Sequence, residues 1–448
     1  MPAGERPVVE DGGKLHVVVL GGGSSGEHFV GALRRLDRDA RITVVERRLV
    51  GGECSYWACM PTKTMLRAPE LAAAVRHTGG ALEAGPLDVE RVFAWRDRVA
   101  ERDDSSQVEW LSEQGAELVR GDARVARPGV LAVDGEELAY DRLVLATGSS
   151  PAVPPLDGLA EAGYWTNVEA TETLEAPPRL LVLGGGPVGC ELAQFFQRAG
   201  SQVTLVQGAP RLLPRIDADA AALVDRALRE DGVDIRLDGR AESVTSNSLL
   251  LAGGAEIDFD RLLVATGRRP NVEGLEPLGL TISKRGIEVD EHLRAAANVW
   301  AIGDVTGIAP FTHVGKYHAR IAAYDFAGRD VRADHRAVPA TIFTDPQVAT
   351  VGEASAGLSA TWPLTSTPRL STYERPKRDG FVKVVADPDR RVLTGAVAVG
   401  PDAGEWLQQL TLAIRAETPV DVLLDVIQPY PTFSEAVFLA LRELNLDL

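Results

Sequence analysis

Two cysteines offer the clearest chemistry in this sequence. Cys54 and Cys59 lie in the segment GGECSYWACMPTK, which ends at Lys63, and they are two of only three cysteines in 448 residues. A glycine-rich loop of the kind that binds a nucleotide phosphate begins upstream at Gly21. A dithiol close to a bound nucleotide indicates electron transfer between a cofactor and a disulfide.

The spacing of the pair favours redox chemistry over a structural bridge. In a regular helix, Cα atoms five residues apart are separated by about 8–9 Å, whereas a disulfide tolerates at most about 7 Å. A Cys54–Cys59 bridge therefore requires a distorted helical turn and should be readily reduced. The alternative is two buried cysteines acting as small hydrophobic residues. Cys190 directly follows a second glycine loop and is predicted to be a packing residue.

Length and charge limit the other possibilities. A chain of this length predicts two to four domains. The net charge of −17 argues against nucleic acid or an anionic membrane as a partner. No run of about 18 apolar residues is found, so no membrane span is expected. Sparse cysteines and the lack of an export signal predict a cytoplasmic protein.

An internal repeat organises the first two thirds of the chain. Each copy contains an apolar strand, a Gly-x-Gly-x-x-Gly loop, a helix and a final strand that ends in Ala-Thr-Gly. The first copy begins at His16 and the second at Leu180. The cysteine segment and two helical stretches, about 62–77 and 90–118, are inserted in the first copy only.

The repeat predicts two dinucleotide sites. Each glycine loop follows a strand and opens a helix, the context in which the backbone approaches a pyrophosphate. Glu46 ends the second strand of the first copy, where an acid binds an adenosine ribose; the alternative is a solvated strand-end carboxylate. Gln207 holds that position in the second copy, and Arg211 is the nearest basic residue. The pattern slightly favours NADPH, or loose selectivity between the two nicotinamides.

The rest of the chain has a different residue pattern. The segment 298–304 is predicted to be a strand that ends at Gly303-Asp304. Beyond residue 337, alternating strand-like runs (381–385 and 392–399), an amphipathic helix (404–416) and a loop rich in Pro, Thr and Ser (363–372) predict a separate α+β unit. The sequence therefore predicts an α/β protein with two Rossmann-like, three-layer dinucleotide-binding domains and a C-terminal α+β domain.

These ordered motifs resemble those of the class I pyridine nucleotide–disulfide oxidoreductases, which include lipoamide dehydrogenase, glutathione reductase and mercuric reductase. The resemblance extends from about residue 15 to 440. It implies an FAD-binding domain (1–150 and 271–336), an NAD(P)H-binding domain (151–270) and an interface or dimerisation domain (337–448). It also implies a homodimer whose active site draws on both subunits.

The resemblance implies roles for individual residues. Cys59 would face the flavin and Cys54 would attack the substrate. Lys63, paired with Glu191, would lie beside the reactive flavin nitrogen and the nicotinamide. Helix N-terminal placement and Lys63 would favour the thiolate. The residues expected to bind FAD are Gly21, Gly23, Gly26, Glu46, Thr147, Gly148 and Asp304. Those expected to bind NAD(P)H are Gly184, Gly186, Gly189, Gln207 and Gly267. No metal cofactor is expected.

The sequence departs from the family at three places. Tyr430 stands where the disulfide reductases carry a histidine that acts as acid and base, while Glu435 is retained. A tyrosine is a poor proton acceptor at neutral pH, so the sequence predicts inefficient turnover of an ordinary disulfide. His313 is a candidate substitute. Mercuric reductases also carry tyrosine here, but this chain ends without their C-terminal cysteine pair. Tyr56 and Trp57 either pack against a neighbouring helix or shape a mouth for an aromatic substrate.

The leading hypothesis is an FAD-dependent enzyme that passes electrons from NAD(P)H through the Cys54–Cys59 disulfide to a small-molecule acceptor. The acceptor would be an unusual disulfide, a quinone-like aromatic or a soft metal ion. The alternatives are a dithiol oxidase running in reverse with O2 or NAD(P)+ as acceptor, a mercuric reductase-like metal reductase, and a non-catalytic redox-sensing flavoprotein.

Overall fold

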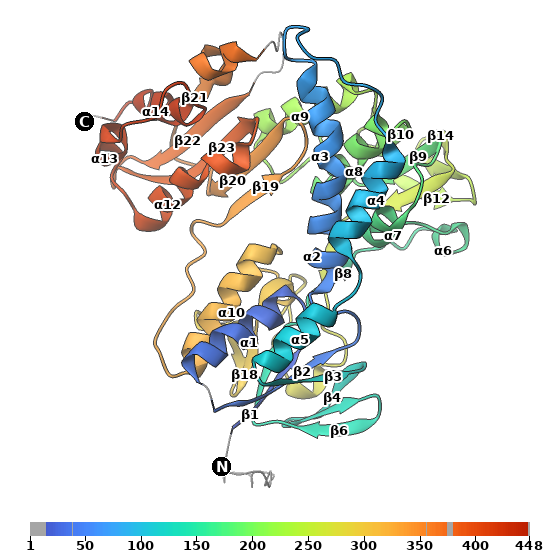
Figure 1. Ribbon diagram of the computed structural model, residues 1–448, viewed down its shortest axis with the longest axis vertical. Helices are drawn as coiled ribbons and strands as arrows, with labels where there is room; N and C mark the ends of the chain where they lie inside the picture. The colour runs from blue at the N-terminus through green and yellow to red at the C-terminus, as the bar shows by residue number, and fades with distance from the viewer. Residues whose placement is uncertain (1–14, 38, 355, 374–379, 447–448) are drawn as a thin grey trace. The chain divides into compact units, whose positions relative to one another are not determined.

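The chain divides into two compact units in the computed structural model, which describes residues 15–446 except 38, 355 and 374–379. The first unit contains the residues up to Cys59 together with 100–150 and 268–334 (Figure 1). The second contains 60–99, 151–267 and the residues from His335 onward. The α/β class predicted from the sequence is confirmed.

The first unit is built on a six-stranded sheet with the order β17-β18-β7-β1-β2-β3. Strand β17 is antiparallel to β18, and the other neighbouring strands are parallel. The strands are β1 (His16–Leu20), β2 (Arg41–Glu46), β3 (Ala116–Arg120), β7 (Arg142–Leu145), β17 (Arg294–Ala296) and β18 (Val299–Ala301).

Both faces of this sheet are covered, which explains why the central strand β1 is buried along its whole length rather than at alternate residues. Val17 and Val19 pack with residues of α1 (Ser24–Leu36), α5 (Ser105–Glu113) and α10 (Thr312–Phe326). Val18 and Leu20 pack on the other side with residues of a three-stranded sheet formed by β4 (Ala123–Arg127), β5 (Val130–Val133) and β6 (Glu136–Ala139). The result is three layers, as the sequence predicts.

The second unit repeats this arrangement. A parallel sheet in the order β11-β10-β9-β15 carries the helices α8 (Pro187–Arg198) and α9 (Ala218–Glu230). Its other face packs with a small sheet of β12 (Ala241–Val244), β13 (Ser248–Leu251) and β14 (Glu256–Asp258). The parallel strands are β9 (Arg179–Leu183), β10 (Gln202–Val206), β11 (Asp234–Arg236) and β15 (Arg261–Val264).

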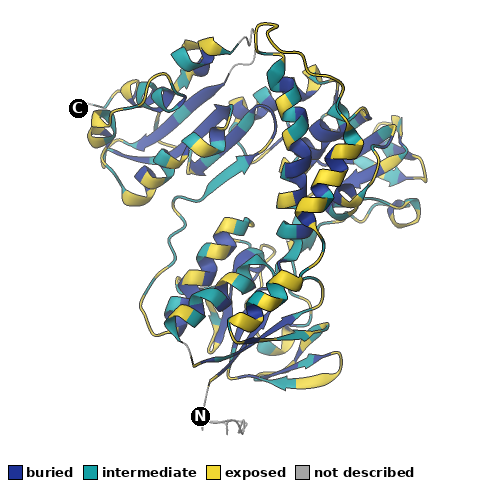
Figure 2. Ribbon diagram, in the orientation of Figure 1, coloured by how far each residue is buried: buried dark blue, intermediate teal, exposed yellow. Residues whose placement is uncertain are grey.

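The second unit also contains the predicted C-terminal α+β segment. Its antiparallel sheet has the order β19-β20-β23-β22-β21. The strands are β19 (Pro339–Ile342), β20 (Gln347–Gly352), β21 (Leu358–Pro363), β22 (Phe381–Asp387) and β23 (Val392–Gly400), and the helices are α11 (Ala403–Trp406), α12 (Gln408–Ala416), α13 (Val420–Asp425) and α14 (Ser434–Arg442). Figure 2 shows the central strands of this sheet as buried.

Three local predictions need correction. The stretch 90–118 is not one helix, because α4 (Val89–Ala100) stops at two residues with positive φ, Glu101 and Arg102, before α5 begins. The helix predicted over 404–416 is divided at Leu407 into α11 and α12. The loop predicted over 363–372 contains two short 3-10 helices, Leu364–Ser366 and Pro368–Thr372.

No helix in the described ranges is both long enough and apolar enough to cross a membrane.

Candidate active site

The two cysteines lie on either side of a helix break in the first unit. Helix α2 (Gly52–Tyr56) carries Cys54, and α3 (Cys59–Val75) begins at Cys59. Trp57 and Ala58 lie between the two helices and separate them. The break is the distorted turn that the Cys54–Cys59 spacing requires, and both cysteines are half-buried free thiols.

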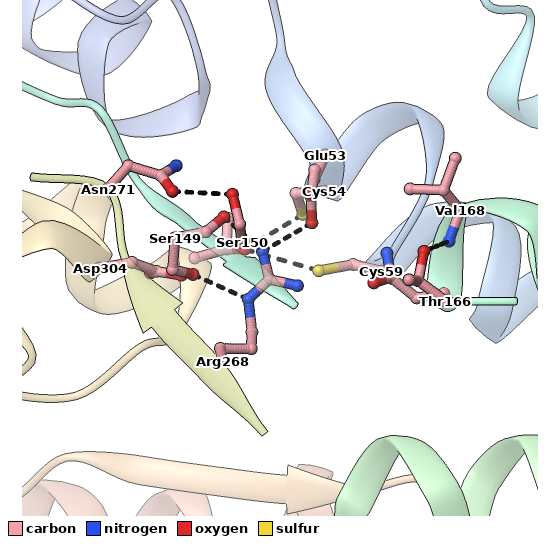
Figure 3. Close-up of polar contacts among 12 residues, drawn as sticks. Glu53, Cys54, Cys59, Ser149, Ser150, Thr166, Val168, Arg268, Asn271 and Asp304 are labelled. Carbon is pink, nitrogen blue, oxygen red and sulfur yellow. Dashed lines mark hydrogen bonds and ion pairs between the residues drawn. The ribbon is translucent and has the colours of Figure 1, made fainter. Parts of the chain in front are cut away.

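A single hydroxyl group contacts both sulfur atoms. Thr312, the first residue of α10, donates a hydrogen bond from its Oγ1 to Cys54 Sγ at 3.1 Å. The same oxygen lies 3.5 Å from Cys59 Sγ. Figure 3 shows the two cysteine side chains beside the polar residues of the same unit. The geometry therefore brings together two thiols and one donor that can stabilise a thiolate.

The surroundings of the pair act on the pKa of Cys54 in opposite directions. A hydrogen bond to Cys59 and burial raise the pKa of Cys54, whereas Thr312 and Lys316 act in the opposite direction. The net direction is upward because the hydrogen bond with Cys59 and burial outweigh the opposing groups, and a charge on Cys59 further disfavours a second negative charge. The raised pKa favours the protonated form of Cys54 while both thiols are present, and the thiolate that the resemblance implies stays a prediction.

Tyr56 and Trp57 are packing residues in this structure. Their side chains are buried, and the rings contact each other with centroids 5.5 Å apart. The Tyr56 hydroxyl donates to the carbonyl oxygen of Val50 at 2.7 Å, and the Arg48 guanidinium lies 3.8 Å from the centroid of the Trp57 ring. Of the two interpretations of these aromatics, the structure supports packing.

The first glycine loop, between β1 and α1, fits a nucleotide cradle. Gly21 has φ +110°, and a Cβ there or at Gly26 would collide with a neighbouring carbonyl oxygen. The N–H of Gly22 donates to Glu46 Oε2 at 2.8 Å, which holds the strand-end carboxylate beside the loop. These glycines leave the backbone N–H groups at the start of α1 open to an anion.

Two further groups of predicted residues lie in the same unit. Thr147 Oγ1 donates to the carbonyl oxygen of Asn271 at 2.7 Å, and the carbonyl of Gly148 accepts the N–H of Asn271 at 3.0 Å. Asp304 lies in a 3-10 helix (Gly303–Thr306) and accepts a hydrogen bond from Ser149 Oγ at 2.6 Å. The FAD residues expected from the sequence are therefore all in the unit that holds both cysteines.

The second glycine loop, between β9 and α8, has the same construction in the second unit. The N–H of Gly185 donates to Gln207 Oε1 at 3.1 Å, the counterpart of the Gly22–Glu46 bond. Gly184 has φ +115°, and a Cβ at Gly189 would collide with its carbonyl oxygen. A Cβ at Gly186 would meet no atom within 4 Å, so open space lies in front of the loop. Gly267 closes β15, and its carbonyl accepts the N–H of Ala152 at 2.9 Å.

Arg211 is used structurally. Its guanidinium donates to the carbonyl oxygens of Leu213 (3.2 Å), Ile216 (2.8 Å) and Pro214 (2.8 Å). These three bonds hold the loop that follows β10. The basic residue nearest to Gln207 in the sequence therefore has its guanidinium directed to backbone carbonyls.

Lys63 and Glu191 form an ion pair in the second unit. Lys63 Nζ lies 2.6 Å from Glu191 Oε2, and the Glu191 side chain is 5% exposed. The other carboxylate oxygen accepts the N–H of Phe343 at 2.8 Å. Lys63 Nζ also lies 4.8 Å from the centroid of the Phe343 ring. The buried carboxylate is thus satisfied at both oxygens, as a buried charge requires.

Tyr430 precedes α14, and Glu435 lies in the first turn of that helix. Tyr430 is 73% exposed, so its side chain is presented outward rather than held in the core of its unit. The Glu435 Oε2 atom is buried and has no hydrogen-bond partner among the residues that the structure describes. His313, the other acid–base candidate, stacks on Phe311 with ring centroids 5.3 Å apart.

Sequence reasoning missed Thr312, although it is adjacent to His313. We predict that Thr312→Val slows alkylation of Cys54 in the reduced protein about tenfold at neutral pH, because the hydrogen bond to the thiolate is lost. Thr312→Ser is the matched control, since it keeps the hydroxyl. Mass-spectrometric mapping of iodoacetamide-labelled peptides measures the rate, and equal rates for the two variants would contradict the role of this hydroxyl.

Comparisons with known proteins agree with this geometry. Residues 15–324 match the pyridine nucleotide-disulphide oxidoreductase family, and residues 338–441 match its dimerisation domain. The chain is 36% identical to a dihydrolipoyl dehydrogenase of Thermus scotoductus, over 96% of this chain and 97% of the relative. It is 34% identical to a mercuric reductase of Acidithiobacillus ferrooxidans, over 98% and 84%.

Solved structures give the same result. The HOCl-induced flavoprotein disulfide reductase RclA from Escherichia coli superimposes with a TM-score of 0.83 at 26% identity, covering 96% of this chain and 99% of that one. LpdA from Mycobacterium tuberculosis superimposes with a TM-score of 0.85 at 26% identity and the same coverage.

Proposed function

Because the chain belongs to the pyridine nucleotide-disulphide oxidoreductases, an FAD-dependent family that uses pyridine nucleotides, we propose that it passes electrons from NAD(P)H through the Cys54–Cys59 pair to a small-molecule acceptor. The observation that carries this proposal is the pair of half-buried thiols on one hydroxyl group, Thr312, at the N-terminus of α10. A pair placed only for packing has no need of such a donor.

The residues that would hold the cofactors lie around two similar loops. In the first unit, Gly21, Gly23, Gly26 and Glu46 would hold the adenosine half of FAD, with Thr147, Gly148 and Asp304 at the adjacent strand ends. When bound, FAD supplies the two-electron carrier between the nicotinamide and the disulfide. In the second unit, Gly184, Gly186, Gly189, Gln207 and Gly267 would hold NAD(P)H. We thus assign FAD to 1–150 and 271–336, and the nicotinamide to 151–270.

The dithiol chemistry balances as a two-electron, two-proton transfer. The Cys54 thiolate attacks one sulfur of an acceptor disulfide, forms a mixed disulfide and releases the other half as a thiolate, which takes a proton. The Cys59 thiolate then attacks Cys54 Sγ. This step forms the Cys54–Cys59 disulfide and releases the remaining half, which takes the second proton.

We propose an acceptor other than an ordinary disulfide, because the Cys54 thiol must lose its proton before it can attack. The hydrogen bond with Cys59 and burial raise the pKa of Cys54, which favours its protonated form, so we expect the attack to need a base. Tyr430 offers a poor base. An unusual disulfide, a quinone-like aromatic or a soft metal ion fits this site better than an ordinary thiol metabolite. A metal reductase is the second candidate, since paired thiolates bind soft metals, one set of relatives is named mercuric reductase, and RclA has been solved as a Cu(II) complex.

The dimerisation domain implies a homodimer. We propose that residues 337–448 form the interface and that Tyr430 and Glu435 complete the active site of the other subunit. The exposed side chains of Tyr430 and Ile427 (94% exposed) are consistent with such a contact. We also propose that the enzyme is cytoplasmic, because its working dithiol needs a reducing environment.

The nicotinamide preference depends on Gln207. With no charge there and with Arg211 bonded to its own loop, we propose weak selectivity with a slight preference for NADPH. Gln207→Glu should lower the ratio of kcat/KM for NADPH to that for NADH about tenfold, because a carboxylate repels the 2′-phosphate. Steady-state kinetics with both nucleotides measures the ratio. Gln202→Glu, which adds the same charge at the exposed start of β10, is the control. An unchanged ratio in Gln207→Glu would contradict this assignment.

Anaerobic titration of the FAD-loaded protein with NADPH and with NADH tests the proposed function. Two-electron reduction should produce the long-wavelength absorbance band of a thiolate lying against the flavin. Bleaching without that band would mean that the flavin acts directly and the dithiol route is wrong. Failure of both nucleotides to bleach the flavin would favour a non-catalytic flavoprotein. Consumption of added dithiol with formation of peroxide would favour the reverse, oxidase direction.

A further inference from the structure

A chain of hydrogen bonds connects Asp304 to the residue that precedes Cys54 (Figure 3). Ser149 Oγ donates to Asp304 Oδ2 at 2.6 Å and accepts Arg268 Nε–H at 2.7 Å. The same guanidinium donates to the Ser149 carbonyl at 2.6 Å and to Glu53 Oε2 at 2.7 Å. All the residues that form these hydrogen bonds belong to the first unit.

Arg268 is partly buried in this arrangement. The Arg268 and Glu53 side chains are 27% and 25% exposed, whereas the next arginine, Arg269, pairs with Glu273 at 61% and 63% exposure. A forked guanidinium that makes three short bonds is geometrically specific. The ordinary surface pair next to it is expected to contribute little, so the two arginines form a natural comparison.

Helix α2 needs such a support. It has five residues, too few to be stable alone, and no side-chain cap at its N-terminus. Its backbone is held at the start, where the Gly51 N–H donates to the Gly22 carbonyl at 2.8 Å. A Cβ at Gly52 would lie 2.8 Å from Gly23 Cα, so the helix touches the first glycine loop there. Glu53 is the first residue after these glycines that has a side chain, and Arg268 binds that side chain. Cys54 directly follows Glu53.

We propose that Arg268 is a positioning residue: through Glu53 it holds α2 and hence the direction of Cys54, and through Ser149 it couples that helix to Asp304. This inference rests on the proposed function, in which Asp304 binds the flavin. Flavin binding and dithiol geometry then stabilise each other, because the coupling between two sites is reciprocal.

Hydrogen–deuterium exchange of the Trp57 amide tests the mechanical part, since this N–H closes α2 on the Glu53 carbonyl at 2.8 Å. Arg268→Met should speed its exchange about tenfold, the effect of losing a charge-assisted hydrogen bond. Saturating FAD should slow this exchange in the wild type and much less in Arg268→Met. The variant Arg268→Met/Glu53→Gln should be no faster than Arg268→Met, because the two side chains act as one unit. Arg269→Met should match the wild type.

The thiolate–flavin band tests the functional part. At equal FAD content, two-electron-reduced Arg268→Met should show a weaker band than the wild type and Arg269→Met. Wild-type exchange and a wild-type band in Arg268→Met would overturn the inference, and so would faster exchange with an unchanged band, which would make Arg268 merely structural. Absence of the band in the wild type would refute the proposed function instead, and the response of Trp57 exchange to FAD would still decide the coupling.

Discussion

Cys54→Ser should abolish reduction of a disulfide acceptor, by at least about 10³-fold, while leaving reduction of the flavin by NAD(P)H intact. The serine hydroxyl cannot form the nucleophilic anion that attacks sulfur, and loss of an attacking group commonly has an effect of this size. Cys59→Ser should also stop acceptor turnover. The two variants should differ in their spectra: Cys54→Ser keeps the long-wavelength thiolate–flavin band and Cys59→Ser loses it. Anaerobic stopped-flow absorbance measures both properties in one experiment.

Cys190→Ala is the control for these variants. Cys190 is completely buried in the core of the second unit, where burial also raises its pKa, so we expect it not to act as a nucleophile. Its removal should change thermal stability but not electron transfer. If Cys54→Ser turned over the acceptor at the wild-type rate, the acceptor would be reduced directly at the flavin. If Cys59→Ser kept the band and Cys54→Ser lost it, the two roles would be exchanged.

The parts of the site that depend on local sequence were predictable. A glycine loop between a strand and a helix requires its own short-range geometry, so Gly21, Gly26, Gly184 and Gly189 could be found from spacing alone. The equivalence of Glu46 and Gln207 follows from the repeat, and each accepts a hydrogen bond from the middle glycine of its loop. The break between α2 and α3 follows from the distance that a disulfide allows.

The parts that depend on tertiary contacts were not predictable. Thr312 is 258 residues from Cys54, and Arg268 is 215 residues from Glu53. No periodicity or spacing relates such positions, because their contact depends on how α10 and the strand β16 (Arg268–Pro270) pack in the first unit. The same limit applies to the thiolate predicted at Cys54: a helix N-terminus and a lysine favour a thiolate, but the sequence reveals neither the second thiol within hydrogen-bond distance nor the burial, both of which raise the pKa of Cys54.

Lys63→Met should slow reduction of the flavin by NAD(P)H about 10²-fold and also destabilise the protein. The family resemblance implies that the Lys63 ammonium lies beside the reacting flavin and nicotinamide atoms. A positive charge there would stabilise the transition state, and removal of one such group commonly has an effect of this size. The stability loss has a separate cause. Glu191, 5% exposed, would keep its bond to the Phe343 N–H but lose its only ion-pair partner in the described chain, and breaking a buried pair costs about 3–5 kcal/mol. Because Lys63 is 34% exposed, the loss here should be below that range.

The variant Lys63→Met/Glu191→Gln separates the two effects. Its neutral amide still accepts the Phe343 N–H and carries no buried charge, so thermal unfolding should return toward the wild-type temperature while flavin reduction stays slow. Lys383→Met is the matched control, because Lys383 pairs with Asp217 at 2.9 Å within the same unit. Lys383→Met should lower the thermal stability without slowing reduction of the flavin. Recovery of the reduction rate together with stability in the double variant would show that Lys63 acts only by neutralising Glu191, and equal slowing in Lys383→Met would remove the special role of the Lys63–Glu191 pair.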